Sequence, residues 1–384
     1  MLKAESGEAV WAVGLMTGTV LDGNIDVALL KTDGESVSEF GVYWLEPYDD
    51  VAMGLLRESL QAAQQWQFRG KEPAVFAKTE SEITRQQSAA VASVLEKNSI
   101  ARDEISVVGF HGQSVLHLAP TETQFGRTRQ LGNGQQMADT LGIPVAWDFR
   151  SADVAAGGQG APLAPVYHRA LLQALKTDTH APVDTAVLNL GGIGNITWWG
   201  GADQLIAFDT GPANAPINDW VLQHGYGQMD TDGKLAKAGS VDEVQLAKYL
   251  QHAYFSQDYP KSLDRFDFSA TIADGLAVPD GAALLTAFAA AAVGKAIDLL
   301  PQRPRNLVLC GGGRRNPLLA AAIAERAVVN ILVAESVGWR GDAVEAECFA
   351  FLAVRTLRGL PLSFPSTTGV PMPQMGGVVS YPKC

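Results

Sequence analysis

The sequence predicts an α/β protein built from two similar domains that face a central cleft. Its 384 residues exceed the usual size of a single domain. One series of elements occurs twice along the chain: a strand hairpin with a glycine-rich turn, then helices, then a further strand. Meanders followed by helices and a strand are typical of a mixed sheet with helical layers, and not of an uninterrupted βαβ series.

The first series begins near residue 9. Strand-like segments with the sequences AVWAVGLM, NIDVALLKT and SVSEFGVYW are separated by Gly- and Asp-rich turns, which predicts an antiparallel meander. Residues 50–97 carry apolar side chains at helical spacing, among them Leu56 and Leu60. A short apolar strand is expected over 105–110, where it runs into the sequence HGQS.

The second series contains the strand-like segments TAVLNLGGIGNIT and QLIAFDTGPAN. Helices are expected over 241–254 and 282–300, and a last strand over 306–310 runs into three glycines. The apolar run at 282–293 is shorter than the roughly 20 residues that a membrane helix needs, so we expect a buried core helix. The Pro- and Gly-rich residues 361–381 show no helical pattern and are expected to pack on the surface.

Composition narrows the function classes. The net charge of −12 argues against a nucleic-acid partner, because binding to a phosphate backbone needs clustered Lys and Arg. Cys310, Cys348 and Cys384 are odd in number and far apart, which argues against a disulfide framework or a zinc site. The first ten residues are charged and mixed, unlike a signal peptide. We therefore expect a cytoplasmic protein with no membrane partner.

Three glycine-rich turns, Gly14–Gly23, Asn189–Asn195 and Cys310–Asn316, each follow a predicted strand. Glycine lets a ligand approach the backbone closely, and successive N–H groups in such a turn bind anions. The GxxxxGK[ST] motif is absent, and the first turn leads into a strand instead of a helix. One such turn is more often a plain hairpin, but three at strand ends favour phosphate and nucleoside binding.

Acidic residues stand beside these turns. Asp22 and Asp26 border the first turn, and Asp209 ends the strand-like run LIAFD just before Thr-Gly-Pro. Phosphoryl transfer needs Mg²⁺ on the phosphates, a positioned nucleophile and often a carboxylate base. A carboxylate held at a strand end suits a general base. From spacing alone, Asp209 is equally a turn-capping residue.

Several longer segments stand together in a recognisable order across nearly the whole chain. They are GLMTGTVLDG, FHGQS, WDFRSADVAAGGQGAPLAP, VLNLGGIGNIT, FDTGPANAPINDW, DGKLAKAG and VLCGGGRRNP. In these motifs the chain resembles the anhydro-N-acetylmuramic acid kinase family, which belongs to the actin-, hexokinase- and Hsp70-like ATPase superfamily.

The resemblance implies two ribonuclease H-like (actin-like ATPase) domains, each a mixed sheet flanked by helices, around a central cleft. The N-terminal domain would comprise residues 1–145 and about 365–384, and the C-terminal domain residues 146–364. It also implies ATP and Mg²⁺ as cofactors and a homodimer. The substrate would be 1,6-anhydro-N-acetylmuramic acid, whose anhydro ring is hydrolysed while O6 is phosphorylated, giving N-acetylmuramic acid 6-phosphate and ADP.

The resemblance further assigns roles to residues. Asp209 matches the family's catalytic base, which would deprotonate a water that attacks the anomeric carbon while the bridge oxygen attacks the γ-phosphate. Glu345, on a helix predicted over 343–357, matches a second acidic position of the active site, against the alternative of a solvated helix face. The implied substrate-binding residues are His111, Arg150, Asp153, Gln159 and Gly160, and the implied metal ligand is Asp22. The implied nucleotide-binding residues are Gly14, Thr17, Gly18, Thr19, Asp22, Gly23, Gly191, Gly192, Asn195, Gly311, Gly312, Gly313 and Asn316.

Two of these positions carry a chemical argument or an alternative of their own. Arg150 suits the lactyl carboxylate of a muramic acid, because a guanidinium pairs with carboxylates through two parallel hydrogen bonds. His111 is equally well interpreted as a core histidine.

The first turn departs from the family pattern. Val20 stands where the family has Ser, and Asn24 lengthens the step to Asp26 by one residue. Valine lacks the hydroxyl that can bond a phosphate, so weaker nucleotide binding is a possible consequence.

Two other functions stay open at this point. One is a kinase for a different sugar, and the Asp148–Pro162 stretch, which is specific to the family, argues against it. The other is a nucleotide- or muropeptide-binding protein without turnover. Asp209 and Glu345 argue against that second function, because a binding protein has no use for a catalytic base.

Overall fold

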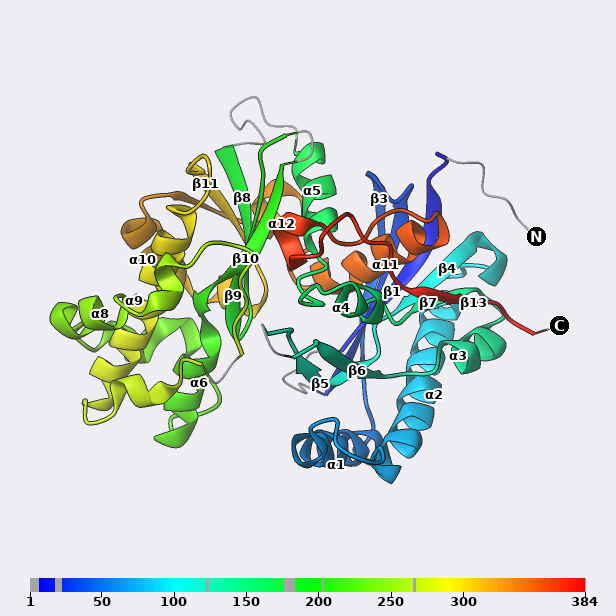
Figure 1. The fold of residues 1–384 in the computed structure, drawn as a ribbon, viewed down its shortest axis with the longest axis horizontal. Helices are drawn as coiled ribbons and strands as arrows, with labels where there is room; N and C mark the ends of the chain where they lie inside the picture. Colours follow the sequence, from blue (N-terminus) through cyan, green and yellow to red (C-terminus); the bar gives the residue numbers. More distant parts are fainter. Residues whose placement is uncertain are drawn as a thin grey trace. The chain divides into compact units, whose positions relative to one another are not determined.

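The computed structural model describes residues 7–17, 23–121, 124–175, 184–201, 204–264 and 267–383. The chain divides into two compact units (Figure 1). Unit 1 comprises Met1–Ala174 and Glu345–Cys384, and unit 2 comprises Leu175–Val344. The predicted boundaries differ from this division, because residues 146–174 and 345–364 lie in unit 1 and not in the C-terminal unit.

Unit 1 contains a six-stranded sheet with the order β13-β7-β4-β1-β2-β3. The first three strands form the predicted antiparallel meander, whereas β4 and β7 run parallel to β1. The C-terminal strand β13 adds antiparallel to β7, so the chain end is part of the sheet, where only surface packing was predicted. The bounds are β1 Val10–Met16, β2 Asn24–Thr32, β3 Val37–Pro47, β4 Ile105–Phe110, β7 Val145–Trp147 and β13 Val378–Ser380.

Helices and a small ribbon complete unit 1. The ribbon pairs β5 (Gln113–Leu118) with β6 (Arg127–Leu131). Asp49 caps α1 by accepting a hydrogen bond from the backbone N–H of Ala52. The helices are α1 Asp50–Trp66, α2 Ala74–Lys97, α3 Gly134–Leu141, α4 Ser151–Ala155, α5 Pro165–Ala174, α11 Val344–Leu357 and α12 Pro365–Thr368, with a 3₁₀ turn at Arg102–Glu104.

Helix α11 packs main chain to main chain on the centre of this sheet. Gly14 of β1 and Gly109 of β4 are register partners. A Cβ atom at Gly14 would lie 1.8 Å from the carbonyl oxygen of Ala346, and one at Gly109 would lie 2.0 Å from that of Phe349. Only glycine permits such an approach, which explains why the segment that follows residue 344 belongs to unit 1.

Unit 2 contains a five-stranded sheet with the order β10-β9-β8-β11-β12. Strands β8, β9 and β10 form an antiparallel meander, and β11 and β12 continue in parallel. When the strands of each sheet are counted along the chain, the third, second, first, fourth and fifth strands therefore stand in that order in both sheets. This ribonuclease H-like arrangement confirms the predicted fold class. The bounds are β8 Thr185–Leu190, β9 Ile193–Trp199, β10 Leu205–Pro212, β11 Asn306–Cys310 and β12 Asn330–Val333.

The core of unit 2 is organised by α9, which is buried along most of its length. It is long and apolar enough to cross a membrane, but 83% of its most apolar window is buried in the unit, as expected of a core helix. The helices are α6 Asn214–Gln223, α7 Lys234–Lys237, α8 Glu243–Tyr249, α9 Val278–Ile297 and α10 Pro317–Ala327. The 3₁₀ turns are Thr231–Gly233, Ala253–Ser256, Ala270–Ala273, Gly312–Arg315 and Ala334–Val337.

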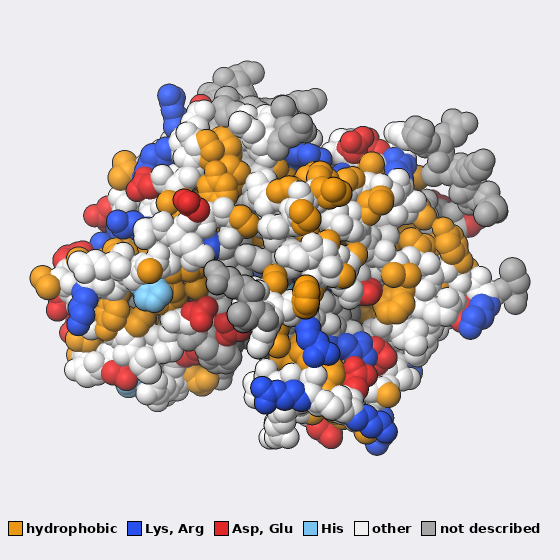
Figure 2. Space-filling view, viewed as in Figure 1, with side chains coloured by type: hydrophobic (Ala, Val, Ile, Leu, Met, Phe, Trp, Pro, Cys, Tyr) orange, Lys and Arg blue, Asp and Glu red, His pale blue; other side chains and the backbone are white. Residues whose placement is uncertain are grey.

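Basic and acidic side chains are interspersed on the visible surface. On the face shown in Figure 2, Lys and Arg side chains lie singly or in small groups among acidic and apolar ones. The described residues of this face therefore present no continuous basic surface.

Candidate active site

Asp209 lies near the end of β10, and both of its carboxylate oxygens accept hydrogen bonds. The side-chain amide of Asn195 on β9 donates to Oδ1 at 2.9 Å. The backbone N–H of Leu263 donates to Oδ2, also at 2.9 Å. A turn-capping aspartate would bond the N–H groups of its own turn; the partners given for Asp209 come from a neighbouring strand and a distant segment.

Burial raises the pKa of Asp209 from 3.8 to about 6, although the hydrogen bonds from Asn195 and Leu263 act in the opposite direction. The carboxyl therefore changes its charge close to neutral pH. A general base works best when its pKa lies near the operating pH. The geometry and the electrostatics of Asp209 both suit a base.

Sheet register places Asp209 in a row of polar side chains. Asn195 pairs with Asp209 across β9 and β10, and with Asn189 across β8 and β9. Residues paired in this way share one face of the sheet. The row ends beside Gly311, where an added Cβ would lie 2.4 Å from the side-chain oxygen of Asn189.

The second and third glycine turns lie beside each other. A Cβ at Gly313 would lie 2.7 Å from that of Leu190 and 2.6 Å from the amide nitrogen of Asn214. That amide donates to the carbonyl oxygens of Leu190 and Gly191 at 3.0 and 2.9 Å, so it links the two turns. Gly311 has a φ of 74°, which favours glycine.

The remaining glycines of these turns are less constrained. An added Cβ would meet nothing within 4 Å at Gly312, an atom at 3.5 Å at Gly191 and one at 3.3 Å at Gly192. The backbone at these residues is thus open to a ligand. Asn316, by contrast, caps α10 through its side-chain oxygen, which accepts hydrogen bonds from Leu318 and Leu319.

Only the two ends of the first glycine turn, which belongs to unit 1, lie within the described residues. Gly18, Thr19 and Asp22 lie outside the described residues, as does Val20. Thr17 is buried and its hydroxyl donates to the side-chain oxygen of Gln113 at 3.1 Å. Gly23 adopts a φ of 88°, and Gly14 lies within β1 beneath α11. Packing alone therefore accounts for the glycine at position 14, and its nucleotide contact stays a prediction.

His111, which is buried, pairs in unit 1 with Arg150, which is partly buried. The Arg150 guanidinium donates to Nε2 of His111 at 3.1 Å and to the carbonyl oxygen of Gly160 at 2.8 Å. Nδ1 of His111 lies 2.7 Å from the carbonyl oxygen of Gly112, which fixes the tautomer with its proton on Nδ1. Burial and the charge of Arg150 lower the pKa of His111 to about 3. His111 is therefore neutral at physiological pH and acts as an acceptor for Arg150.

Asp153 ties three segments of unit 1 together. Its Oδ1 accepts from the backbone N–H of Gly160 at 2.6 Å, and its Oδ2 accepts from the hydroxyls of Thr368, at 2.6 Å, and Ser363. The neighbouring backbone N–H of Gln159 donates to the carbonyl oxygen of Thr368 at 2.7 Å. Asp153 thus shapes the loop that carries Gln159 and Gly160, and its side chain is only 2% exposed.

Glu345 lies in the first turn of α11, with an exposed side chain. Burial lowers the pKa of Arg150, and the negative charge of Glu345 is among the groups that oppose this shift. Glu345 is therefore electrostatically coupled to the guanidinium of the His111 pair. The predicted helix over 343–357 is confirmed, and the exposed position leaves the catalytic assignment of Glu345 a prediction.

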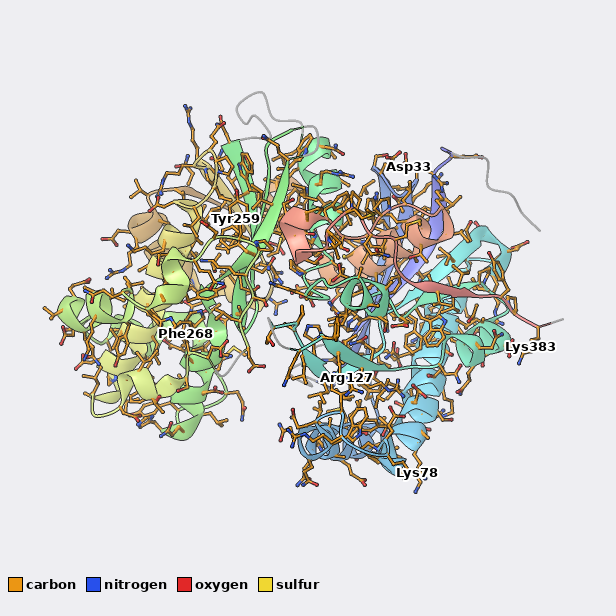
Figure 3. The ribbon with its side chains drawn as sticks, in the orientation of Figure 1. Asp33, Lys78, Arg127, Tyr259, Phe268 and Lys383 are labelled. Carbon is orange, nitrogen blue, oxygen red and sulfur yellow. The ribbon has the colours of Figure 1, made fainter. Side chains whose placement is uncertain are left out.

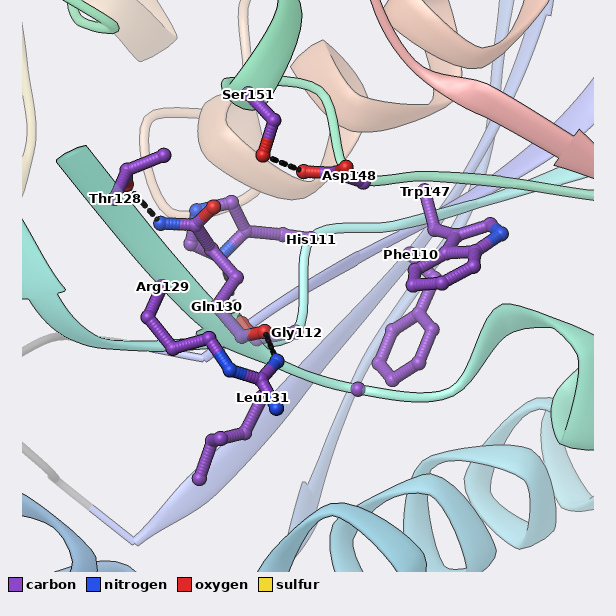
Figure 4. Close-up of a pocket in the computed structure, with 11 residues that line it drawn as sticks. Phe110, His111, Gly112, Thr128, Arg129, Gln130, Leu131, Trp147, Asp148 and Ser151 are labelled. Carbon is purple, nitrogen blue, oxygen red and sulfur yellow. Dashed lines mark hydrogen bonds between the residues drawn. The ribbon is translucent and has the colours of Figure 1, made fainter. Parts of the chain in front are cut away.

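A small cavity opens beside His111 (Figure 4). Side chains from β6 and from the start of α4 line it, among them Gln130, Asp148 and Ser151. The Ser151 hydroxyl donates to Asp148 at 2.5 Å. Asp148 adopts a φ of 52°, which is uncommon outside glycine. Sequence reasoning missed these residues, although Asp148 and Ser151 flank Arg150 in the DFRSAD motif.

Comparison with known proteins decides the family. The family model described as anhydro-N-acetylmuramic acid kinase matches residues 10–382. The chain belongs to the anhydro-N-acetylmuramic acid kinase family. The proteins of that name from Mesorhizobium japonicum and Rhizobium rhizogenes are 62% and 61% identical to it over 370 residues, covering 96% of this chain and 99% of each relative. The one from Nitrobacter winogradskyi is 47% identical over 372 residues, covering 97% and 99%.

Other residues that contact Asp209 or the third glycine turn were missed by sequence reasoning. Tyr254, Lys261 and Leu263 contact Asp209 or each other, but they lie 45 to 54 residues further along the chain. Arg314 is buried and donates to Glu335, Asp342 and the carbonyl oxygen of Gly311, so it braces the third glycine turn. The Arg-Arg pair after the three glycines was a signal for such a brace.

Proposed function

We propose that this family member is an ATP-dependent kinase that opens the anhydro ring of 1,6-anhydro-N-acetylmuramic acid with water and phosphorylates O6. The products are N-acetylmuramic acid 6-phosphate and ADP, in the recycling of peptidoglycan. The observation that carries the proposal is the partly buried carboxylate of Asp209, which has a donor on each oxygen and a pKa raised to about 6.

In this reaction Asp209 takes a proton from the water that attacks the anomeric carbon. In the same event the C1–O bond to the bridge breaks and the bridge oxygen, O6, attacks the γ-phosphorus of ATP, from which ADP leaves. Each oxygen of Asp209 has two lone pairs, and the donors from Asn195 and Leu263 use one on each. The remaining lone pairs are available to the water.

The glycine turns of unit 2 are proposed to bind ATP. The open backbone of Gly191, Gly192 and Gly312 suits phosphates, which bind successive N–H groups. Groups of three or more His, Cys, Asp or Glu that could hold a metal are absent from the described residues. We propose that Mg²⁺ is held mainly by substrate phosphates and water, with one carboxylate, that of Asp22, which lies outside the described residues. Bound there, Mg²⁺ would neutralise charge on the phosphates.

The pair of His111 and Arg150 in unit 1 is proposed to bind the sugar. A guanidinium has five N–H groups, more than Arg150 uses on His111 and Gly160. The rest suit the lactyl carboxylate, and Asp153 shapes the loop with Gln159 and Gly160 beside it. A homodimer and a cytoplasmic location are further proposals that rest on the family.

The test is to incubate the purified protein with Mg-ATP and the anhydro-sugar and to follow the sugar by mass spectrometry. We expect a gain of one water and one phosphoryl group, lost in Asp209→Asn. ADP release with another sugar but not this one would assign a different kinase activity. If neither phosphorylated sugar nor ADP forms with any of the sugars tested, the binding-protein alternative is favoured.

A further inference from the structure

Asn195 belongs to the glycine turn that the sequence assigns to nucleotide phosphates, yet its side chain points to Asp209. Its amide nitrogen lies 2.9 Å from Oδ1 of Asp209, and the two residues are register partners on adjacent strands. Strand pairing on both sides fixes the backbone of Asn195 and places its side chain on the same face of the sheet as that of Asp209.

The segment Tyr254–Leu263 holds Asp209 from the other direction. The backbone N–H of Leu263 donates to Oδ2 at 2.9 Å. The Tyr254 hydroxyl donates to the carbonyl oxygen of Asp209 at 2.6 Å, and the N–H of Asp209 donates to the carbonyl oxygen of Lys261 at 3.1 Å. The main chain and the carboxylate of Asp209 are thus both bound by one segment.

Lys261 keeps this segment closed on β10. Its ammonium donates to the carbonyl oxygen of Tyr254 at 2.8 Å, and its side chain is only 3% exposed. It lies 4.5 Å from the ring centre of Tyr254 and 5.5 Å from that of Phe208, where aromatic faces attract a cation. Tyr259, labelled in Figure 3, stacks on Phe208 with 5.4 Å between ring centres. The segment therefore packs on the strand residue that precedes Asp209.

We propose that Asn195 and the segment Tyr254–Leu263 are positioning residues, which fix both carboxylate oxygens of the Asp209 base. In this proposal the Asn195 amide binds Asp209 and does not bind the nucleotide. The inference rests on the proposed function. A base aimed at one water needs this preorganisation, because misplacement of a reacting group by about 1 Å can lower a rate about 100-fold.

Asn195→Ala separates the two roles of Asn195 by steady-state kinetics. A positioning role predicts a fall in kcat of about 10- to 100-fold, as expected for loss of a hydrogen bond to a charged group, with the KM for ATP unchanged within about twofold. A nucleotide-binding role predicts a raised KM for ATP with kcat largely kept, which would overturn the inference. Asn330→Ala makes the same chemical change on the edge strand β12 and serves as the matched control.

A titration tests the inference without any turnover. In protein labelled with ¹³C at the aspartate carboxyls, the Asp209 signal is assigned by its absence in Asp209→Asn. We expect its pKa, about 6 in the wild type, to rise in Asn195→Ala, because the lost hydrogen bond favours the ionised form. The ionisable side chains of the contacting segment are Asp258, Tyr259, Tyr254, whose pKa burial raises, and Lys261, whose pKa burial lowers to about 8.

The kinetics and the titration distinguish failure of the proposed function from failure of the positioning role. If the wild type makes no phosphorylated sugar, the proposed function fails, yet an unchanged Asp209 pKa in Asn195→Ala still overturns the positioning role. Tyr254→Phe covers the case in which Asn195→Ala does not fold, since it removes only a hydroxyl. It should lower kcat about tenfold and leave both KM values unchanged. An unchanged kcat would contradict a positioning role for the segment Tyr254–Leu263.

Discussion

The sheets of the two units share one strand order but hold their polar residues in different ways. In unit 2, Asn195 and Asp209 are strand residues, and the sheet register alone makes them neighbours. In unit 1, His111 and Arg150 follow the ends of β4 and β7, and Asp153 lies on the short helix α4. The backbone hydrogen bonds of the sheet position strand residues, whereas residues beyond the strand ends depend on separate contacts for their position.

Those contacts in unit 1 come from far along the chain. Asp153 binds Thr368 and Ser363, and Phe349 of α11 packs on the ring of His111 with 4.5 Å between ring centres. The comparison teaches that one sheet topology can present a carboxylate placed by strand register in one unit and residues beyond the strands, held by distant contacts, in the other. It also predicts that changes in the two units will differ in kind.

The largest effect is expected from Asp209→Asn in unit 2. The change keeps the shape of the side chain but removes the base, so kcat should fall about 1,000-fold. Binding of ATP, measured by calorimetry, should stay within about twofold of the wild type. A kcat within about tenfold of the wild type would show that strand-borne Asp209 is not the base.

Gly14→Ala and Gly109→Ala test the contact between α11 and the sheet of unit 1. Each added Cβ would collide with the backbone of α11, so the free energy of unfolding should fall by about 3 kcal/mol. Gly54→Ala in α1 is the control, because an added Cβ there meets nothing within 4 Å and should stabilise the helix by about 0.5–1 kcal/mol. Urea denaturation measures all three variants. Equal stabilities would mean that α11 does not rest on these glycines.

Asp153→Asn should loosen the ties of unit 1 without touching unit 2. One carboxylate oxygen, which accepts hydrogen bonds, is replaced by an amide NH₂ that faces the donors of Thr368 or Gly160. The free energy of unfolding should therefore fall by about 2 kcal/mol. We expect the KM for the sugar to rise while the KM for ATP is kept. Asp139→Asn, an exposed aspartate on α3, is the matched control. A change confined to the KM for ATP would contradict this division of roles.

The smallest predicted effect is a pH dependence. With a pKa of about 6, Asp209 is largely protonated at pH 5, so kcat should be about tenfold lower there than at pH 8. His111, with a pKa of about 3, stays neutral throughout this range and should not contribute. Because the Asp209 pKa is raised on folding, the folded state binds more protons between pH 4 and 6, and its stability falls as the pH rises through this window. Asp209→Asn should remove that loss in thermal denaturation.

Local sequence patterns predicted the elements that depend on nearby residues. The two meanders, the core helix α9 and the helix that begins near Glu345 follow from hydrophobic spacing, and the structure confirms them. The partner of β7 was not predictable, because β13 lies more than 230 residues further along and is only three residues long. The position of α11 on Gly14 and Gly109 also depends on contacts far apart in the chain, which is why the predicted unit boundaries differ.

The site shows the same limit. The adjacent glycine turns and the position of Asp209 at a strand end follow from motifs. The role of Asn195 depends on register across three strands, and the roles of Tyr254 and Lys261 depend on how a distant segment folds back on β10. Asp153 resembles a ligand in its motif, but its bonds to Ser363 and Thr368 are visible only in three dimensions.

The joint between α11 and the sheet of unit 1 has a consequence for motion. Contacts between side chains can loosen by rotamer changes, but main chain resting on main chain at Gly14 and Gly109 has no rotamers to change. The first turn of α11, which carries Glu345, must therefore fluctuate together with β1 and β4. Hydrogen exchange should find the amide of Ala350, which faces Gly14, among the slowest in unit 1, opening only when the unit itself unfolds.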